Sequence, residues 1–255
     1  MTLETKDKSM RDMPAPQPKE VMVAAVEHAV KTRRAIRAFR PDTVDIGLVE
    51  RILSAARYAP SGSNIQPWSV HVVTDEALQR LGRELTETFL SGEAERADFA
   101  YYPTRWRAPY IERRRKTGWS LYQLAGVARG DREAGDRQRA RNYSFFGAPV
   151  GLVFAIDDDL NQGSWLDYGM FIQSVMILAR AHGLHTCPLA AIGNYPDIVR
   201  SHLGIAAGQI VVAGMALGHP DQGEPTNRLI TEREPVAAFT TFHGSRAPAP
   251  ATPVP

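Results

Sequence analysis

Residues 150–156 read VGLVFAI, a run without a polar or charged side chain, and this run decides the fold class. A continuous apolar run of this length predicts a central strand that is buried on both faces of a sheet. A second run, QIVVAGMAL at 209–217, predicts another core strand, and WSVHVV at 68–73 alternates enough to predict a third. We therefore expect a sheet built from strands that lie far apart in the sequence.

Helical periodicity fills most of the intervals between these strands. Apolar residues recur at three- and four-residue steps in several segments, and helices are expected over 19–32, 45–59, 75–90, 164–182 and 194–203. Asp45 and Asp75 are the expected N-caps of the second and third helices, and Gly183 and Gly204 are expected to close the last two. The 164–182 helix is apolar nearly all round and is expected to be buried.

The alternation of helices and strands predicts one α+β domain, without internal repeats, over residues 19–240. Residues 1–18 and 241–255 are polar or rich in Pro and Ala, and we interpret them as flexible tails. Residues 99–141 mix arginines with aromatic residues and are interpreted as a helical excursion on the outside of the domain. The segment from Cys187 to Ala190 reads as strand or loop.

Composition places the chain among folded proteins. It has 255 residues, 44% of them apolar and 23% charged, and a single cysteine, Cys187, so an internal disulfide framework is excluded. The first twenty residues hold no apolar core of a signal peptide, and no later stretch approaches the ~20 apolar residues of a membrane span. These features favour a cytoplasmic protein that does not associate with membranes.

The net charge of +2 gives no support to a nucleic-acid partner, although the charge is unevenly distributed. Residues 96–141 hold twelve Lys or Arg against five Asp or Glu, which leaves a local basic patch as a rival hypothesis. Motifs for phosphate loops, dinucleotide folds, zinc proteases and serine hydrolases are absent. His182 and His185 are spaced for metal ligation but lack further ligands, so no metal site is expected.

Three arginines, Arg33, Arg34 and Arg37, stand in an extended segment between a helix and Pro41. Guanidinium groups in such a cluster suit a phosphate or another anion, because arginine offers a planar fork of donors that stays charged. A solvated helix end paired with carboxylates explains the cluster equally well from spacing alone. The loop PSGSNIQPW at 60–68, rich in short polar residues, favours the first interpretation, because it suits contact with a polar ligand.

These segments together resemble the flavin-dependent nitroreductase family. The resemblance rests on RRAIRAF at 33–39, APSGSNIQPWSVHVV at 59–73, HGLHTCPLA at 182–190, and VVAGMALGHPD at 211–221 followed by Asn227 and Arg228. It also includes the stretch from Glu112 to Asp157 and covers about residues 20–235. The resemblance implies a three-layer α+β fold with a central, mostly antiparallel sheet flanked by helices. It further implies an intertwined homodimer that binds FMN at two interface sites built from both chains.

The resemblance also assigns roles to individual residues. It implies that Arg33 and Arg228 hold the FMN phosphate, that Arg34 and Ala35 lie beside the ribityl chain, and that Arg37 lies by the pyrimidine edge. A fixed cation at that edge stabilises the negative charge that builds up on reduced flavin. The partner chain's copy of one loop is expected to contact the same FMN through Pro60, Ser61, Gly62 and Asn64. Another segment is expected to lie over the ring, with a backbone N–H donated to flavin N5 by Ala190: Pro188, Leu189 and Ala190.

The sequence departs from the family in one respect and leaves two assignments open. Some members carry a lysine two residues before the position of Arg228, where this chain has Thr226, so phosphate neutralisation leans more heavily on the arginines. Asn142 is a candidate contact to the flavin ring, and a helix or strand cap explains it almost as well. Core packing is preferred for Trp119 and Phe146, while residues 99–141 are a candidate active-site lid.

The resemblance implies an FMN-dependent oxidoreductase working by a ping-pong mechanism. NAD(P)H would pass a hydride to flavin N5, and a nitroaromatic compound or a quinone would then be reduced in the same place, to a hydroxylamine or an amine. The flavin carries the chemistry, so no catalytic side chain is expected. The alternatives are reductive dehalogenation, flavin breakdown or ene reduction on the same scaffold, or a flavin- or nucleic-acid-binding protein without enzymatic activity.

Overall fold

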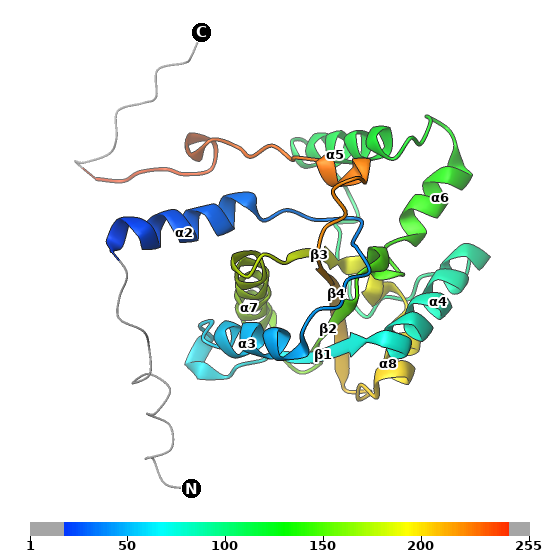
Figure 1. Ribbon diagram of the computed structural model, residues 1–255, viewed down its shortest axis with the longest axis horizontal. Coiled ribbons are helices and arrows are strands. Elements are labelled where there is room, and N and C mark those ends of the chain that lie inside the picture. The colour runs from blue at the N-terminus through cyan, green and yellow to red at the C-terminus, as the bar shows by residue number, and fades with distance from the viewer. Residues whose placement is uncertain (1–17, 245–255) are drawn as a thin grey trace, which may run out of the picture.

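The computed structural model describes residues 18–244, and its centre is a four-stranded sheet in the order β1-β2-β4-β3 (Figure 1). The strands are β1 Ser69–Thr74, β2 Val150–Asp157, β3 His185–Leu189 and β4 Gln209–Gly218. Each pairs with its neighbours in an antiparallel register. The three predicted strands are confirmed, and the segment that starts at Cys187 becomes the edge strand β3 followed by a 3-10 turn at Ala190.

Strand β2 is an inner strand, as its uninterrupted apolar run predicts. Alternate side chains of a strand point to opposite faces of the sheet. Leu152, Phe154 and Ile156 pack into one hydrophobic cluster, and Val153 and Ala155 pack into the other. Because both faces are covered, no position of the strand can be polar until its last residue, Asp157, which is exposed.

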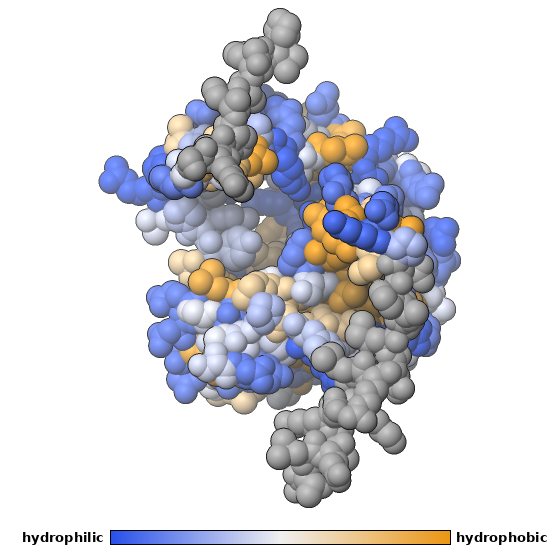
Figure 2. All heavy atoms as spheres, turned by 90° about the vertical axis from the view of Figure 1, so that its left-hand side faces the viewer, coloured by the Kyte–Doolittle hydropathy of each residue, from blue (hydrophilic) through white to orange (hydrophobic). Residues whose placement is uncertain are grey.

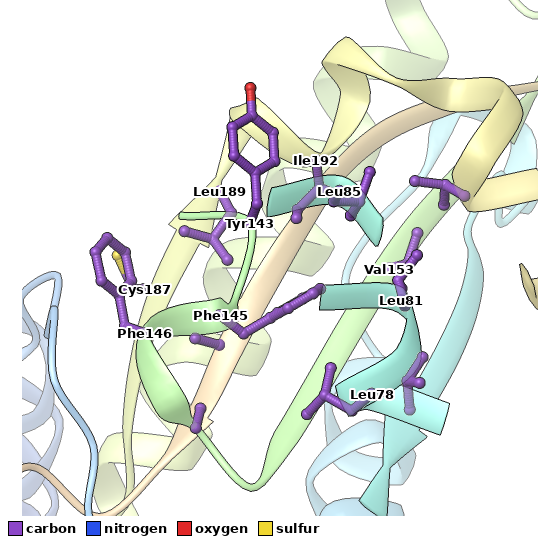
Figure 3. Close-up of a cluster of buried hydrophobic side chains, with 14 of the residues drawn as sticks. Leu78, Leu81, Leu85, Tyr143, Phe145, Phe146, Val153, Cys187, Leu189 and Ile192 are labelled. Atoms are coloured by element: carbon purple, nitrogen blue, oxygen red, sulfur yellow. The ribbon is translucent and has the colours of Figure 1, made fainter. Parts of the chain in front are cut away.

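Two helical layers cover the two faces of the sheet (Figure 1). Helices α3, Ile46–Ala56, and α7, Gln162–Ala181, pack on one face through Ile52, Phe171 and Val175. Helices α4, Asp75–Ser91, and α8, Pro196–Leu203, cover the other face through Leu81, Leu85 and Val199. Figure 3 shows that Phe145, from the turn before β2, points toward α4, whereas Phe146 points the other way, toward Cys187; both belong to the same hydrophobic cluster. The expected three-layer α+β fold is confirmed.

Three helices lie outside these layers. Helix α2, Lys19–Thr32, extends away from the body and buries only Ala29. Helices α5, Tyr110–Leu124, and α6, Arg132–Ala140, form the excursion at 99–141, and no residue of α5 is buried. Short 3-10 turns complete the described chain: η2 Gly62–Asn64, η3 Phe145–Gly147, η4 Ala190–Asn194, η5 Pro225–Arg228 and η6 Val236–Ala238.

Most helix boundaries agree with the sequence pattern. The Asp45 side chain caps α3 by accepting a hydrogen bond from Gly47 N at 3.0 Å. Gly183 and Gly204 follow α7 and α8 in the left-handed conformation, with φ of +77° and +65°, as helix ends closed by glycine do. Asp75 was expected to cap α4, but the helix begins at Asp75 itself and the capping position belongs to Thr74.

Two expectations about burial are wrong. Helix α7 is buried along one stripe only, because Leu166 and Met170 are 73% and 41% exposed in the single chain. Trp119 is 53% exposed and lies under the Arg129 guanidinium instead of in the core, because α5 packs on no hydrophobic layer. Phe146, the other aromatic residue assigned to the core, is buried as expected.

The predicted tails fall almost entirely outside the described residues, which begin at Pro18 and end at Gly244. Within that range no helix is long and apolar enough to cross a membrane. The thiol of Cys187 is buried in the core beside Phe146 (Figure 3), and burial raises its pKa to about 11.

Candidate cofactor site

The extended segment 33–41, here called the arm, is fixed along the edge of the sheet by backbone pairing. Ile36 N donates to Thr186 O at 3.1 Å, and Ala35 forms a parallel bridge with Thr186, so the arm adds to the outer side of β3. Farther along, Phe39 N donates to Phe146 O at 3.2 Å. The arm therefore holds its arginines at fixed positions, since buried Ile36 anchors the segment between them.

Asn227 joins the arm to η5. Its Oδ1 accepts a hydrogen bond from Arg37 N at 2.7 Å, and its Nδ2 donates to Ala38 O at 2.8 Å. The side chain is only 5% exposed, so these bonds are shielded from water and hold two segments 190 residues apart in sequence. Sequence reasoning quoted Asn227 as part of a motif but gave it no role. The structure shows that it positions the residue next to it, Arg228, beside the arm.

Arg33, Arg34 and Arg228 line one cavity of about 1210 Å³, here called the arginine cavity. This volume is at or above the range of roughly 300–1,000 Å³ that small-molecule sites occupy. Further residues of α2, α7, β3 and the segment after η5 complete its wall, among them Arg180, His185 and Arg233. Arg33 and Arg34 thus lie on the same cavity as Arg228, although they are far apart in the chain, whereas Arg37 is not among the residues that line it. Their roles toward FMN stay predictions.

The electrostatics of the arginine cavity suit an anion. Among residues 18–244, Arg33, Arg34 and Arg228 form no ion pair with a carboxylate. Burial lowers the pKa of Arg33, and the neighbouring cation of Arg233 lowers it further. An arginine that is half-buried, unpaired and repelled by another cation is destabilised until an anion binds. This contradicts the alternative in which the cluster is a solvated helix end neutralised by carboxylates.

Unpartnered polar atoms beside the cavity also favour a bound ligand. His185 Nδ1 and Thr186 Oγ1 are buried without a hydrogen-bond partner in the described structure. Burial lowers the pKa of His185 to about 4, and the cations of Arg180, Arg34 and His219 add to this effect. Buried polar groups are normally paired, so orphaned atoms next to a cationic cavity fit a ligand rich in oxygen, such as a ribityl phosphate.

The loop that carries Pro60, Ser61, Gly62 and Asn64 lies elsewhere. Gly62 N donates to Asp167 Oδ2 at 3.0 Å, which places the loop against the first half of α7. Arg180, in the arginine cavity, is thirteen positions farther along the same helix, or about 20 Å. Within one chain the loop and the arginines therefore lie at opposite ends of α7. Asp167, which sequence reasoning missed, is the residue that holds the loop.

The loop is also held in an unusual conformation. Ser63 and Asn64 have positive φ values of 51° and 58°, and Ser61 Oγ accepts a hydrogen bond from Gln66 N at 3.0 Å. Non-glycine residues with positive φ are uncommon and cluster at binding sites and tight turns. Residues 62–66 of the loop are exposed, so their short polar groups are available to a neighbouring molecule.

The segment predicted to lie over the flavin ring follows the edge of the sheet. Pro188 is exposed on β3, where its missing N–H costs no sheet hydrogen bond. The side chain of Leu189 is 1% exposed and packs into the core, and Ala190 begins η4 at the rim. Leu189 therefore offers no side chain to a ligand, while Pro188 is exposed and Ala190 is half-buried. This agrees with the type of contact predicted, while the contact itself stays a prediction.

Asn142 and its neighbour Arg141 make contacts within the chain. Asn142 Nδ2 donates to Arg139 O at 2.7 Å, which is the helix-end role that the sequence left open. Its neighbour Arg141, to which no role was assigned, is half-buried, stacks over Phe146 and lies 3.7 Å from Glu224 Oε1. No group of three or more potential metal ligands occurs among the described residues.

The excursion is connected to the same region. Lys116 of α5 pairs with Glu232 at 2.7 Å, and Arg113 pairs with Glu234 at 2.9 Å, so α5 lies beside the segment that follows η5 (Figure 1). At its other end, Phe99 packs edge-on against Trp165 of α7, with ring centroids 4.7 Å apart. Five of the twelve basic residues of 96–141 have carboxylate partners, which reduces the positive charge of the basic patch.

Comparison with known proteins matches residues 30–219 to the family described as the nitroreductase family. A 4-nitrobenzoate reductase of Pseudomonas putida is 40% identical over 215 residues, covering 84% of this chain and 94% of the relative. A nitrobenzene nitroreductase of Ectopseudomonas oleovorans is 35% identical and covers 85% and 96%. The crystal structure of the FMN-dependent nitroreductase NfnB of Mycobacterium smegmatis, in complex with NADPH, superposes with a TM-score of 0.84. It is 30% identical and covers 88% of this chain and all of that one.

Proposed function

Since this chain belongs to the nitroreductase family, we propose that it is a flavoprotein oxidoreductase that binds FMN and uses NAD(P)H to reduce nitroaromatic compounds. One observation carries the cofactor assignment. Three arginines without carboxylate partners, from the arm and η5, converge on the arginine cavity within the matched fold. The relatives named for nitrobenzoate and nitrobenzene support the choice of substrate class.

The residues of this chain would bind, orient and electrostatically tune the cofactor. Arg33 and Arg228 would hold the phosphate, and Arg34 would lie along the ribityl chain. Arg37 is fixed through its backbone to Asn227, which would keep its guanidinium at the pyrimidine edge. When bound, FMN would supply two-electron chemistry, with NAD(P)H as the reductant and a nitroaromatic compound or quinone as the acceptor of a ping-pong reaction. The product, a hydroxylamine or an amine, depends on how many such cycles the substrate undergoes.

The functional unit that we propose is an intertwined homodimer. In one chain the loop at 60–64 lies about 20 Å along α7 from the arginine cavity, so a shared site requires two chains. Helix α2 exposes Val21, Val23 and Val26, and the segment after η5 exposes Ile230 and Phe239. Figure 2 looks onto this side of the molecule and shows apolar patches gathered around a hollow. Exposed apolar area of this kind marks a protein interface.

A cytoplasmic location is part of the proposal and is supported by the free, buried thiol of Cys187, which suits a reducing compartment. The excursion at 99–141 would act as a lid that selects substrates, because α5 is tied to the segment following η5 by two ion pairs. The assignment of FMN depends on neither the location nor the lid.

The first experiment is an anaerobic absorption titration of the purified protein after incubation with FMN. We expect a bound flavin spectrum that bleaches with NADPH or NADH and returns on addition of 4-nitrobenzoate or nitrobenzene. Failure to bind FMN would overturn the proposal. If the flavin spectrum bleaches but no nitro compound restores it, the FMN assignment stands and the substrate class is wrong. Dehalogenation or ene reduction would then be the reaction to test.

A further inference from the structure

The arginine cavity contains one guanidinium to which neither the sequence nor the family resemblance assigns a role, that of Arg180. Arg180 lies in the last turn of α7 and is half-buried. Its Nε donates to Thr32 Oγ1 at 2.9 Å, and its Nη2 lies 3.3 Å from His28 Nε2. These two contacts hold the guanidinium at the end of α2, on the wall of the arginine cavity. In the described structure it has no carboxylate partner.

The cavity wall that holds Arg180 carries several cations and two carboxylates, Asp221 and Glu234, of which Glu234 is paired with Arg113. Arg180 forms no ion pair with a carboxylate between residues 18 and 244, and its Nη1 has no acceptor there. Arg34 and His185 line the same cavity, and the buried Nδ1 of His185 is unpartnered. A half-buried cation next to another cation and an orphaned polar atom is a position that an anion would stabilise.

The position at which some family members carry a phosphate-binding lysine cannot supply this charge. It is Thr226 in this chain, fully buried, and its Oγ1 donates to Glu224 Oε1 at 3.2 Å. Two additional cations line the cavity. Lys31 is paired with Glu27, and Arg233 is exposed and its Nη1 already donates to Thr231 O, Thr231 Oγ1 and Glu232 O. Arg180 is thus the cation that is both preoriented and free to donate.

We infer that Arg180 is a ligand of the FMN phosphate and supplies, from α7, the positive charge that Thr226 does not. The inference rests on the proposed function, because it presupposes that the cavity binds FMN. It makes the end of α7 part of the cofactor site, with the phosphate held between three separate elements: the arm, η5 and α7. Thr32, which accepts from Nε, is then a positioning residue for this ligand.

The test compares the affinities of FMN and riboflavin, which differ only in the phosphate, for the purified protein by fluorescence titration. Arg180→Gln should raise the Kd for FMN about 10- to 100-fold, the effect of losing one charge-assisted hydrogen bond, and change the Kd for riboflavin less than about 2-fold. Arg180→Lys should recover most of the FMN affinity. Thr32→Val removes the hydrogen bond that positions Arg180 and should raise the Kd for FMN less than Arg180→Gln does. Arg80→Gln on α4, outside the cavity, is the matched control and should leave the Kd for FMN unchanged.

A purely structural role would weaken FMN and riboflavin binding equally, and that result would overturn the inference, as would unchanged FMN affinity in Arg180→Gln. Inorganic phosphate provides an independent measurement. It should raise the melting temperature of the flavin-free wild type and not that of Arg180→Gln. If the wild type binds neither FMN nor riboflavin, the proposed function fails as well, whereas FMN binding that is insensitive to Arg180 overturns this inference alone.

Discussion

At the scale of single residues, Arg228 gives the most direct test of the phosphate assignment. It is exposed on η5 and points to the same cavity as Arg33, without a carboxylate partner in the described structure. Arg228→Ala should therefore raise the Kd for FMN by about 10-fold or more and release the flavin during dialysis. Arg80→Ala on α4, remote from the cavity, is the control. Full retention of the flavin absorbance after dialysis of Arg228→Ala would refute the assignment.

Arg37 tests electrostatics rather than affinity alone. A fixed cation beside the pyrimidine edge stabilises the charge of the reduced flavin, so its removal should lower the reduction potential. We expect Arg37→Ala to lower the midpoint by roughly 30 mV or more, since about 30 mV in a two-electron couple corresponds to about 1.4 kcal/mol. Arg37→Lys should retain most of the potential. Spectroelectrochemical titration measures it, and an unchanged midpoint in Arg37→Ala would place this side chain elsewhere.

His185 predicts a pH dependence of the flavin-free protein. Burial and nearby cations hold its pKa at about 4, whereas in an unfolded chain it is about 6.5. Between these values the unfolded chain binds a proton that the native protein does not, so stability falls as the pH drops through this window. Urea unfolding at pH 7 and pH 5, at one protein concentration, should show a smaller loss for His185→Gln than for the wild type.

The control for this prediction is His182→Gln, which changes an exposed histidine just after the end of α7. It should leave the difference between pH 7 and pH 5 as it is in the wild type. If His185→Gln retains the full pH dependence, the loss of stability in acid arises from other groups and His185 does not titrate in this window.

At the scale of elements, η4 packs closely on β4. A Cβ at Gly214 of β4 would lie 2.5 Å from Ile192 Cγ1 and 3.1 Å from Ile192 Cβ, and Ile192 is fully buried in η4. Gly214→Ala must therefore displace η4, which begins with Ala190. We expect a loss of about 1–3 kcal/mol in the free energy of unfolding, the cost typical of overpacking.

Gly118→Ala on α5 is the matched control, because a Cβ there would contact nothing within 4 Å. It should stabilise the helix by roughly 0.5–1 kcal/mol, since alanine loses less backbone freedom than glycine on folding. Urea denaturation of the two variants gives both values. Equal stability of Gly214→Ala and the wild type would mean that η4 tolerates displacement.

The sequence predicted most helices and strands because the signals for them lie in adjacent residues. The period of α2 and α3, the alternation in β1 and the glycines after α7 and α8 each depend on a few adjacent side chains. The burial of the excursion at 99–141 was not predicted correctly. Helix α5 contains Trp119 and other aromatic residues but packs on no hydrophobic layer, so its composition suggested a burial that does not occur.

At the scale of the whole molecule, the exposed side of α2 predicts assembly. Val26 is 60% exposed in the middle of a helix that buries only Ala29, and a 14-residue helix has little stability without a partner. Val26→Asp should place a charge in the proposed interface, convert the dimer to a monomer in light scattering after gel filtration, and release FMN. Leu90→Asp, 53% exposed at the end of α4, is the control and should retain the dimer.

A wild-type protein that elutes as a monomer, yet binds FMN, would contradict the two-chain site. The loop at 60–64 would then have no role in binding, because it cannot reach the arginine cavity of its own chain. A dimer that Val26→Asp leaves intact would place the interface on other exposed apolar residues, such as those after η5.

The sequence by itself determined the inner strands, the helices around them and the identity of the arm arginines. Each of these is a local property: an apolar run such as 150–156, a helical period, or a cluster such as Arg33, Arg34 and Arg37. The resemblance to a family added the predicted roles of Arg228 and Ala190, because a family motif links residues that local composition cannot link.

Only the tertiary structure decided which of these residues meet. It brought Arg228 to the arm through Asn227, placed Arg180 on the same cavity, and separated both from the loop at 60–64. It also left one side of α7 exposed, although that helix is apolar nearly all round. The physical reason is that burial and charge pairing depend on which elements pack together, and that packing joins residues up to 190 positions apart.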